Sequence, residues 1–254
     1  MKKITFILPV AALALLMFLP ACSSNEKPEA GLQAPEVTQT EVPAASAKSE
    51  KEDDDADEDA KSISSMTAKE AKAATIQNLI KAYIGETTAS AKYAAYSQKA
   101  KEAGMSQIAL LFQATSTSEK IHANNHRSVL EDLGAAIPEV KPVYTVNYTR
   151  ENLMDAIAGE SYEIATMYPE FLSTANTADL PLALTSLNYA FRTEQRHKAL
   201  YEKALAALQA NQVNTLSSDY YVCPTCGNTY DAAPPKRCRV SMTSSERMQK
   251  ISAV

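Results

Sequence analysis

The chain has 254 residues, of which 45% are hydrophobic, and its net charge is -5 at pH 7. This acidic balance gives no reason to expect a nucleic acid as partner. Three of the four cysteines lie in the last few dozen residues, and this odd number argues against a closed disulfide framework in an exported protein.

Residues 1–22 have the pattern of a secretion signal, with Lys2 and Lys3 followed by an apolar run over residues 4–19. The run ends in Leu19-Pro20-Ala21-Cys22, which resembles a bacterial lipoprotein cleavage box. We therefore expect Cys22 to carry a lipid that anchors the exported protein to a bacterial membrane, on the periplasmic or cell-surface side. The alternative is an uncleaved membrane helix, but the run is shorter than the about 20 residues that a span needs, and Pro9 interrupts it.

Residues 23–65 are rich in Ala, Pro, Ser, Glu and Lys, and they include an acidic run over residues 52–59. A segment of this composition cannot bury enough apolar surface to offset its ordering entropy. The sequence therefore predicts a disordered acidic tether between the lipid and a folded domain.

Residues 66–212 show helical periodicity in four segments, so the predicted fold class is all-α, a four-helix bundle. The first segment opens with the capping box Thr67-Ala68-Lys69-Glu70 and ends at Gly104. The second carries apolar residues from Ile108 and ends at Gly134, the third begins after Thr149, and the fourth starts at Pro181. Residues 213–254 then form a small separate tail.

The motif Glu-x-x-His occurs twice, as Glu119-Lys120-Ile121-His122 and Glu194-Gln195-Arg196-His197. A Glu and a His three residues apart lie on one face of a helix and can bind the same metal ion. Further acids occur on the other helices, and most of these polar residues fall on the apolar stripes, where an unpaired carboxylate is strongly unfavourable. Since basic residues on these stripes are few, a pair of cations compensates the acids better than ion pairs would. The candidate ligands are Glu86, Glu119, His122, Glu160, Glu163, Glu194 and His197.

This ligand arrangement is known from di-iron proteins with ferritin-like bundles, and the sequence resembles the rubrerythrin family over residues 66–241. The resemblance rests on Tyr83-Ile84-Gly85-Glu86, on Ser118 to His122, on Ala156-Ile157-Ala158-Gly159-Glu160-Ser161-Tyr162-Glu163 with Met167-Tyr168-Pro169-Glu170-Phe171, on the second Glu-x-x-His, and on Cys223-Pro224-Thr225-Cys226-Gly227. It implies a ferritin-like bundle with a rubredoxin-like tail, two iron ions, and reduction of hydrogen peroxide to water.

The resemblance also implies individual roles. Glu119 and Glu194 would bridge the two irons, and Glu163 and His122 would exchange as ligands of one iron between the oxidised and reduced states. Tyr93 and Tyr168 match tyrosines that hydrogen-bond to ligating carboxylates, although packing is an alternative role for each. His126, one turn after His122, either lines the entrance to the site or is a satisfied core histidine. The family further implies a homodimer, and hard oxygen and imidazole donors suit iron or manganese.

The tail departs from the family pattern at its second knuckle, Cys238-Arg239-Val240-Ser241, where a serine replaces the fourth cysteine. Cys223, Cys226, Cys238 and Ser241 would hold one further iron or zinc. Alternatively the site binds no metal, and Cys223 and Cys226 form a disulfide or remain thiols. If this centre is lost, reducing equivalents must come from an external electron donor.

We therefore expect a membrane-tethered di-iron peroxidase that defends the cell envelope against peroxide. Two other interpretations remain open at this point: a ferroxidase or iron-handling protein, and a non-catalytic envelope lipoprotein. The extra acid Glu163 and the rubredoxin-like tail favour the peroxidase.

Overall fold

The computed structural model describes residues 66–254. The predicted signal peptide, the lipidation site Cys22 and the acidic tether lie outside the described residues. Within residues 66–254, no helix combines the length and the apolar character that a membrane span requires.

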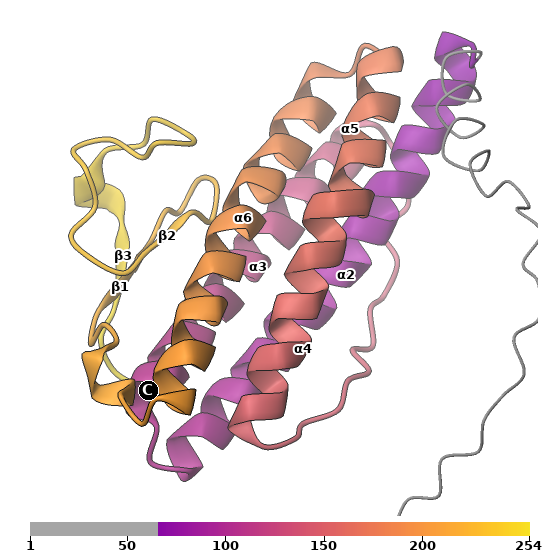
Figure 1. Ribbon diagram of the computed structural model, residues 1–254. Helices are drawn as coiled ribbons and strands as arrows, with labels where there is room; N and C mark the ends of the chain where they lie inside the picture. Colours follow the sequence, from indigo (N-terminus) through magenta and orange to yellow (C-terminus); the bar gives the residue numbers. More distant parts are fainter. Residues whose placement is uncertain (1–65) are drawn as a thin grey trace, which may run out of the picture. The chain divides into compact units, whose positions relative to one another are not determined.

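The described chain forms a four-helix bundle, as the sequence predicts (Figure 1). Its long helices are α2 (Ala68–Glu102), α3 (Ser106–Asp132) and α6 (Pro181–Gln209). The remaining side of the bundle consists of α4 (Thr149–Tyr162), a π-helical turn η1 (Glu163–Met167) and α5 (Tyr168–Thr177). The short 3-10 helix η2 (Val213–Thr215) leads from α6 into the tail.

The helix ends follow the local signals in the sequence. At Thr67 the side-chain oxygen accepts a hydrogen bond from the Glu70 backbone N–H, and the Glu70 carboxylate accepts one from the Thr67 backbone N–H at 2.9 Å. This is the predicted capping box. Gly104 and Gly134, which follow α2 and α3, have φ values of 73° and 70°, a conformation that glycine adopts without strain.

The third helical segment contains an interruption that the periodicity does not predict. The backbone N–H of Tyr168 donates to the carbonyl of Glu163, five residues earlier, so the turn is wider than an α-helical one. Pro169 follows at once and has no N–H with which to continue the α-helical hydrogen bonding. The wide turn therefore begins at the additional predicted ligand, Glu163.

The apolar core consists of two clusters, and the predicted ligands lie between them along each helix. On α2, for example, Leu79 belongs to one cluster and Tyr93 to the other, with Glu86 between them. On α6, Leu187 and Leu200 flank the Glu-x-x-His motif in the same way. The bundle thus surrounds the acids with apolar packing on both sides.

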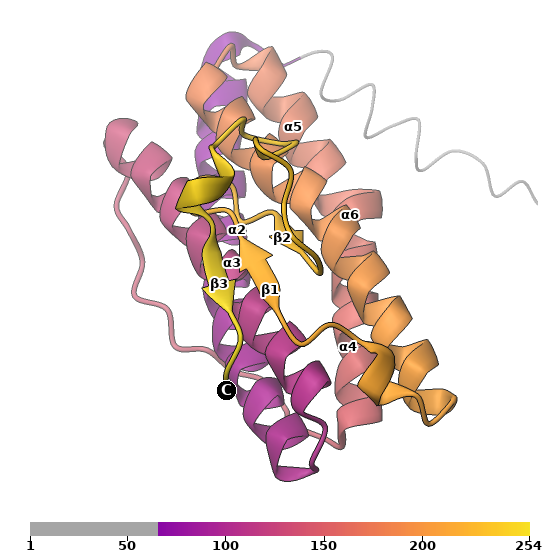
Figure 2. The ribbon, with the colours of Figure 1, turned by 90° about the vertical axis from the view of Figure 1, so that its left-hand side faces the viewer.

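The tail is a small antiparallel sheet with strand order β2-β1-β3. Its strands are β1 (Tyr220–Val222), β2 (Thr229–Tyr230) and β3 (Gln249–Ile251), with a 3-10 helix η3 (Ser245–Arg247) before β3. Figure 2 shows the sheet against α3 and α6. Tyr220, Val222 and Ile251 are buried in the same cluster as core residues of the bundle, so the tail packs directly on the helices.

Candidate metal centre

Six of the seven predicted ligands meet in the interior of the bundle, and each is at most 2% exposed. They form two groups of four whose ligand atoms lie within 4.8 Å of one another. One group consists of Glu86, Glu119, His122 and Glu194, and the other of Glu119, Glu160, Glu194 and His197. The two groups share Glu119 and Glu194.

The two shared carboxylates each direct one oxygen to each group. Glu119 places Oε2 3.0 Å from His122 Nδ1 and Oε1 3.0 Å from His197 Nδ1. Glu194 places Oε1 2.8 Å from His122 Nδ1 and Oε2 2.7 Å from His197 Nδ1. Two carboxylates placed in this way would bridge a pair of metal ions, and each ion would then have its own histidine and its own terminal acid.

The donor atoms fit metal ions better than they fit one another. Both oxygens of Glu119, both of Glu194, and the Nδ1 atoms of His122 and His197 are buried without a hydrogen-bond partner. The carboxylate oxygens and the histidine nitrogens lie close together, but they do not have the geometry of hydrogen bonds. Instead, these ligand atoms point toward common centres. Buried polar atoms without partners are strongly unfavourable, and two cations coordinated by these oxygens and nitrogens would satisfy them.

The outer nitrogens of both histidines are held by the tail. His122 Nε2 lies 3.0 Å from the Cys226 carbonyl, which can only accept, so the ring carries its proton on Nε2. His197 Nε2 lies 3.1 Å from Thr229 Oγ1, whose own proton goes to the Gly227 carbonyl. Each contact therefore fixes the tautomer that leaves Nδ1 free to bind a metal.

Two tyrosines orient the terminal acids. Tyr93 donates to Glu160 Oε1 at 3.0 Å, and Tyr168 donates to Glu86 Oε1. These are the contacts that the resemblance implied for Tyr93 and Tyr168. Such hydrogen bonds keep a ligating carboxylate in one orientation.

Glu163 does not belong to either tight group. It lies on η1 and is partly buried. Burial raises the pKa of its carboxyl well above the ordinary value, and the charges of Glu86 and Glu194 raise it further. Glu163 therefore lies beside the two ligand groups, whereas His122 is a member of one of them.

The pKa shifts in the cluster show that its acidic and basic side chains do not neutralise one another well. Burial raises the pKa of Glu86 to about 7, and burial likewise raises the pKa of Glu160 well above its usual range. Burial opposes a charge on His197, yet Glu119 and Glu194 raise its pKa to about 9. Bound metal ions would displace protons from these groups, so metal binding is coupled to proton release.

His126 is fully buried, so it does not line an open entrance to the site. Its Nδ1 lies 2.8 Å from Ser186 Oγ, and its Nε2 lies 3.3 Å from the Tyr168 hydroxyl. Burial, together with the charge of the neighbouring His122, lowers the pKa of His126 to about 3. His126 is thus a neutral imidazole with a polar partner on each nitrogen.

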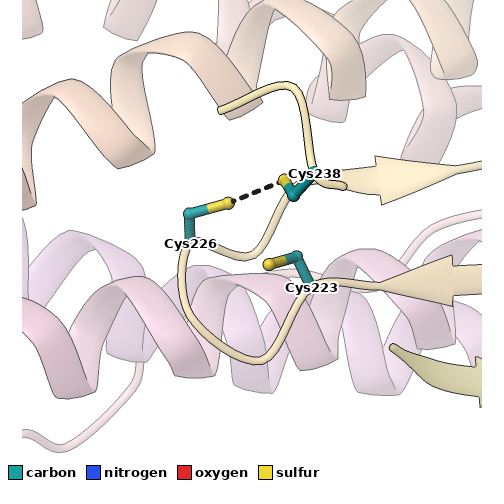
Figure 3. A group of neighbouring side chains, drawn as sticks. All are labelled: Cys223, Cys226 and Cys238. Carbon is teal, nitrogen blue, oxygen red and sulfur yellow. Dashed lines mark hydrogen bonds between the residues drawn. The ribbon is translucent and has the colours of Figure 1, made fainter. Parts of the chain in front are cut away.

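The tail brings its three cysteines together (Figure 3). All three are buried and free, so the alternative of a Cys223–Cys226 disulfide is wrong for this structure. The sulfurs of Cys226 and Cys238 lie 3.5 Å apart. Hydrogen bonds from the other two thiols lower the pKa of Cys238, so this group provides a thiolate, the form that binds metals.

Ser241 occupies the fourth position of this cluster, with its Oγ 3.2 Å from Cys223 Sγ. The two knuckles have matching backbones, since Gly227 N donates to the Cys223 carbonyl at 2.9 Å and Met242 N to the Cys238 carbonyl at 3.0 Å. Met242 adopts a φ of 61°, the left-handed conformation for which Gly227, with a φ of 78°, is better suited. The second knuckle therefore keeps the backbone geometry of a metal-binding turn, although Ser241 and Met242 stand where a cysteine and a glycine are expected.

The sequence did not identify the contacts between the tail and the bundle. A Cβ at Gly227 would overlap His122 Nε2 and Ser118 Oγ, so the backbone approaches α3 more closely than any side chain allows. Ser118 donates to the Gly227 carbonyl at 2.7 Å. A glycine directly after Cys226 was the only local signal, and it has an equally good explanation in the knuckle turn itself.

The fold and the site define a class of protein: a ferritin-like bundle with a carboxylate and histidine centre for two metal ions, joined to a small cysteine-bearing metal-ribbon tail. Comparison with known proteins agrees. The sequence model of the family described as rubrerythrin matches residues 77–205. Rubrerythrin-2 of Clostridium acetobutylicum is 32% identical over 70% of this chain and 96% of that protein. Nigerythrin of Nitratidesulfovibrio vulgaris is 31% identical over 68% of this chain and 84% of the nigerythrin chain.

A solved structure of nigerythrin in a mixed-valence state superposes with a TM-score of 0.63 and 28% identity, covering 69% of this chain and 86% of that one. The chain belongs to the rubrerythrin family. Its metal complement is that of the family, a di-iron centre in the bundle, and the cysteine cluster provides for a tail metal. Membership makes the protein an oxidoreductase and supports an iron-centre function in oxidative stress.

Proposed function

We propose that this protein is a peroxidase that reduces hydrogen peroxide to water at the di-iron centre. The observation that carries the proposal is the division of Glu119 and Glu194 between two histidines, one oxygen to each. Two ions held by the same two carboxylates would lie close enough together to act on one small substrate.

When bound, a ferrous pair supplies two electrons, which together with two protons convert one peroxide into two water molecules. The protein residues hold the reactants and exclude water. Tyr93 and Tyr168 hold the terminal acids Glu160 and Glu86 in place, and the apolar clusters on both sides keep bulk solvent away. The fixed tautomer of each histidine keeps its ligand nitrogen directed inward.

Glu163 is proposed to exchange with His122 as ligand of one iron, as the family resemblance implies. Support comes from the position of Glu163 on the wide turn η1, beside the tight cluster and close enough to feel the charges of Glu86 and Glu194.

The tail is proposed to bind one iron or zinc through Cys223, Cys226, Cys238 and Ser241. With iron it would deliver electrons to the centre, since the Cys226 carbonyl contacts the His122 ring directly at 3.0 Å. An external donor would then reduce the tail. With zinc, which has no redox chemistry, the tail would be structural.

We further propose that Cys22 is lipidated, that the protein is exported and anchored to a bacterial membrane, and that it acts as a homodimer. The N-terminal sequence pattern supports the lipid anchor. Mass spectrometry of the N-terminal peptide from the native host tests it: a diacylglycerol on Cys22 supports the proposal, and an intact Met1 contradicts it.

The activity is tested by mixing the anaerobic, ferrous protein with peroxide or with oxygen and following iron oxidation optically. Oxidation by peroxide much faster than by oxygen supports a peroxidase, and the reverse order indicates a ferroxidase. Glu119→Ala removes one shared carboxylate, so we expect it to lose iron and peroxide reactivity. Normal iron content and rate in this variant contradict the ligand assignment.

A further inference from the structure

The reaction proposed above needs protons in a site closed to solvent, and one chain of hydrogen bonds connects that site with the surface. The chain begins at Ser186 on α6, passes through His126 on α3 and Tyr168 on α5, and ends at the ligand Glu86 on α2. His126 is fully buried and belongs to neither group of ligand residues.

The hydrogen bonds in this chain all point inward. Tyr168 donates its only proton to Glu86, so its oxygen must accept from His126 Nε2. A neutral imidazole with its proton on Nε2 has a bare Nδ1, which therefore accepts from the Ser186 hydroxyl. Each group thus donates to the next group toward the metal centre.

The outer end of the chain lies beside a surface groove, although Ser186 itself is only 5% exposed. Ser186 lines a groove of about 340 Å³ between α3 and α6, and the same groove is lined by Ser128, Asp132 and Thr185. The inner end lies at the centre, because Glu86 accepts from Tyr168 on Oε1 while its Oε2 faces His122 Nδ1 at 3.6 Å. The chain therefore spans the whole distance from a solvent groove to a ligand oxygen.

We propose that Ser186, His126 and Tyr168 form a proton relay that carries protons from the groove to Glu86. This proposal rests on the proposed function, in which each peroxide consumes two electrons from the iron pair and two protons. In one inward shift, the Tyr168 O–H proton passes to Glu86 Oε1, the His126 Nε2–H proton to the Tyr168 oxygen, and the Ser186 O–H proton to His126 Nδ1.

A groove water then gives a proton to the Ser186 oxygen, so one proton enters for each shift and no electron moves along the chain. The shift leaves the imidazole proton on Nδ1. Rotation of the ring toward the groove would let Nδ1 lose that proton to a groove water and Nε2 gain one from the same water, which restores the Nε2–H form before the next proton.

Two substitutions interrupt the relay and keep the surroundings. His126→Gln retains a donor and an acceptor but cannot pass a proton from one to the other. Ser186→Ala removes the outermost hydroxyl at a buried position, and Ser186→Thr retains it. Ser128→Ala is the matched control, because Ser128 lines the same groove but lies outside the chain.

The experiment measures iron content, unfolding midpoint and the rate of iron oxidation by peroxide in H2O and D2O for the full-length protein and these variants. General acid–base groups contribute typically on the order of a hundredfold or more. We expect His126→Gln and Ser186→Ala to slow oxidation by about that factor with unchanged iron content and an enlarged solvent isotope effect. Ser186→Thr and Ser128→Ala should retain the wild-type rate.

An unchanged rate and isotope effect in Ser186→Ala overturns the relay, and this variant decides the question if His126→Gln loses iron. Nitrogen NMR of His126 gives a readout independent of activity: the relay requires a proton on Nε2 in the resting protein, and a proton on Nδ1 overturns it. If the wild-type protein does not react with peroxide, the proposed function fails. The same variants are then compared with oxygen as oxidant, whose reduction also consumes protons, and an equal rate there overturns the relay as well.

Discussion

Gly227→Ala should release the tail from the bundle. The new Cβ would lie 2.9 Å from His122 Cδ2 and would overlap His122 Nε2 and Ser118 Oγ. His122 cannot move aside, because it is fully buried and its Nδ1 lies among three carboxylates. The tail backbone must therefore withdraw.

The size of the effect follows from the backbone conformation at this position and from the hydrogen bonds that withdrawal breaks. A left-handed backbone costs a non-glycine residue about 1 kcal/mol. Withdrawal breaks the hydrogen bonds from His122 to the Cys226 carbonyl and from Ser118 to the Gly227 carbonyl, worth about 1 kcal/mol each. We expect the free energy of tail docking to fall by about 3 kcal/mol.

Gly104→Ala is the matched control, because Gly104 has nearly the same φ, 73°, and open space at the Cβ position. It should cost only the backbone part, about 1 kcal/mol. The difference of about 2 kcal/mol corresponds to about thirtyfold faster hydrogen exchange of the tail amides in Gly227→Ala. Equal exchange in the two variants, measured by mass spectrometry, would refute the docking contact.

Two further predictions concern the tail metal and pH. Ser241→Cys should give a red, rubredoxin-like absorbance when the protein is loaded with iron, because Ser241 already lies 3.2 Å from Cys223; a colourless variant would show that the tail does not fold around iron. In the metal-free protein, the pKa of Glu86 is raised from 4.5 to about 7 and that of His197 from 6.5 to about 9. Both groups bind protons more tightly when folded, so the free energy of unfolding should fall as pH rises from about 5 to 9. Urea unfolding at several pH values checks this, and a rise in stability over the same range would contradict it.

The bundle could be predicted from the sequence because its determinants are local. Helical periodicity fixes which face of each helix is buried, and the capping box and terminal glycines mark the ends. Glu119 and Glu194 stood out because an acid on an apolar stripe needs a partner. Two copies of Glu-x-x-His supplied enough ligands to make that partner a metal pair.

The features that could not be predicted depend on contacts between distant segments. The wide turn at Glu163 has the same polarity pattern as an ordinary helix, and Pro169 alone does not distinguish a π turn from a kink. The docking of the Cys226 and Gly227 backbone on His122 joins residues about a hundred positions apart in the chain. The hydrogen-bond partners of His126 lie on two other helices, so its place in a hydrogen-bonded chain could not be predicted from the sequence either.

The proposed function requires that this chain holds two irons that together reduce one peroxide. The most direct test is an iron assay on the purified protein, followed by anaerobic reduction and titration with hydrogen peroxide. We predict about two irons per chain in the bundle, oxidised completely and rapidly by one equivalent of peroxide. A folded protein without iron, or irons that peroxide does not oxidise, would contradict the proposed function.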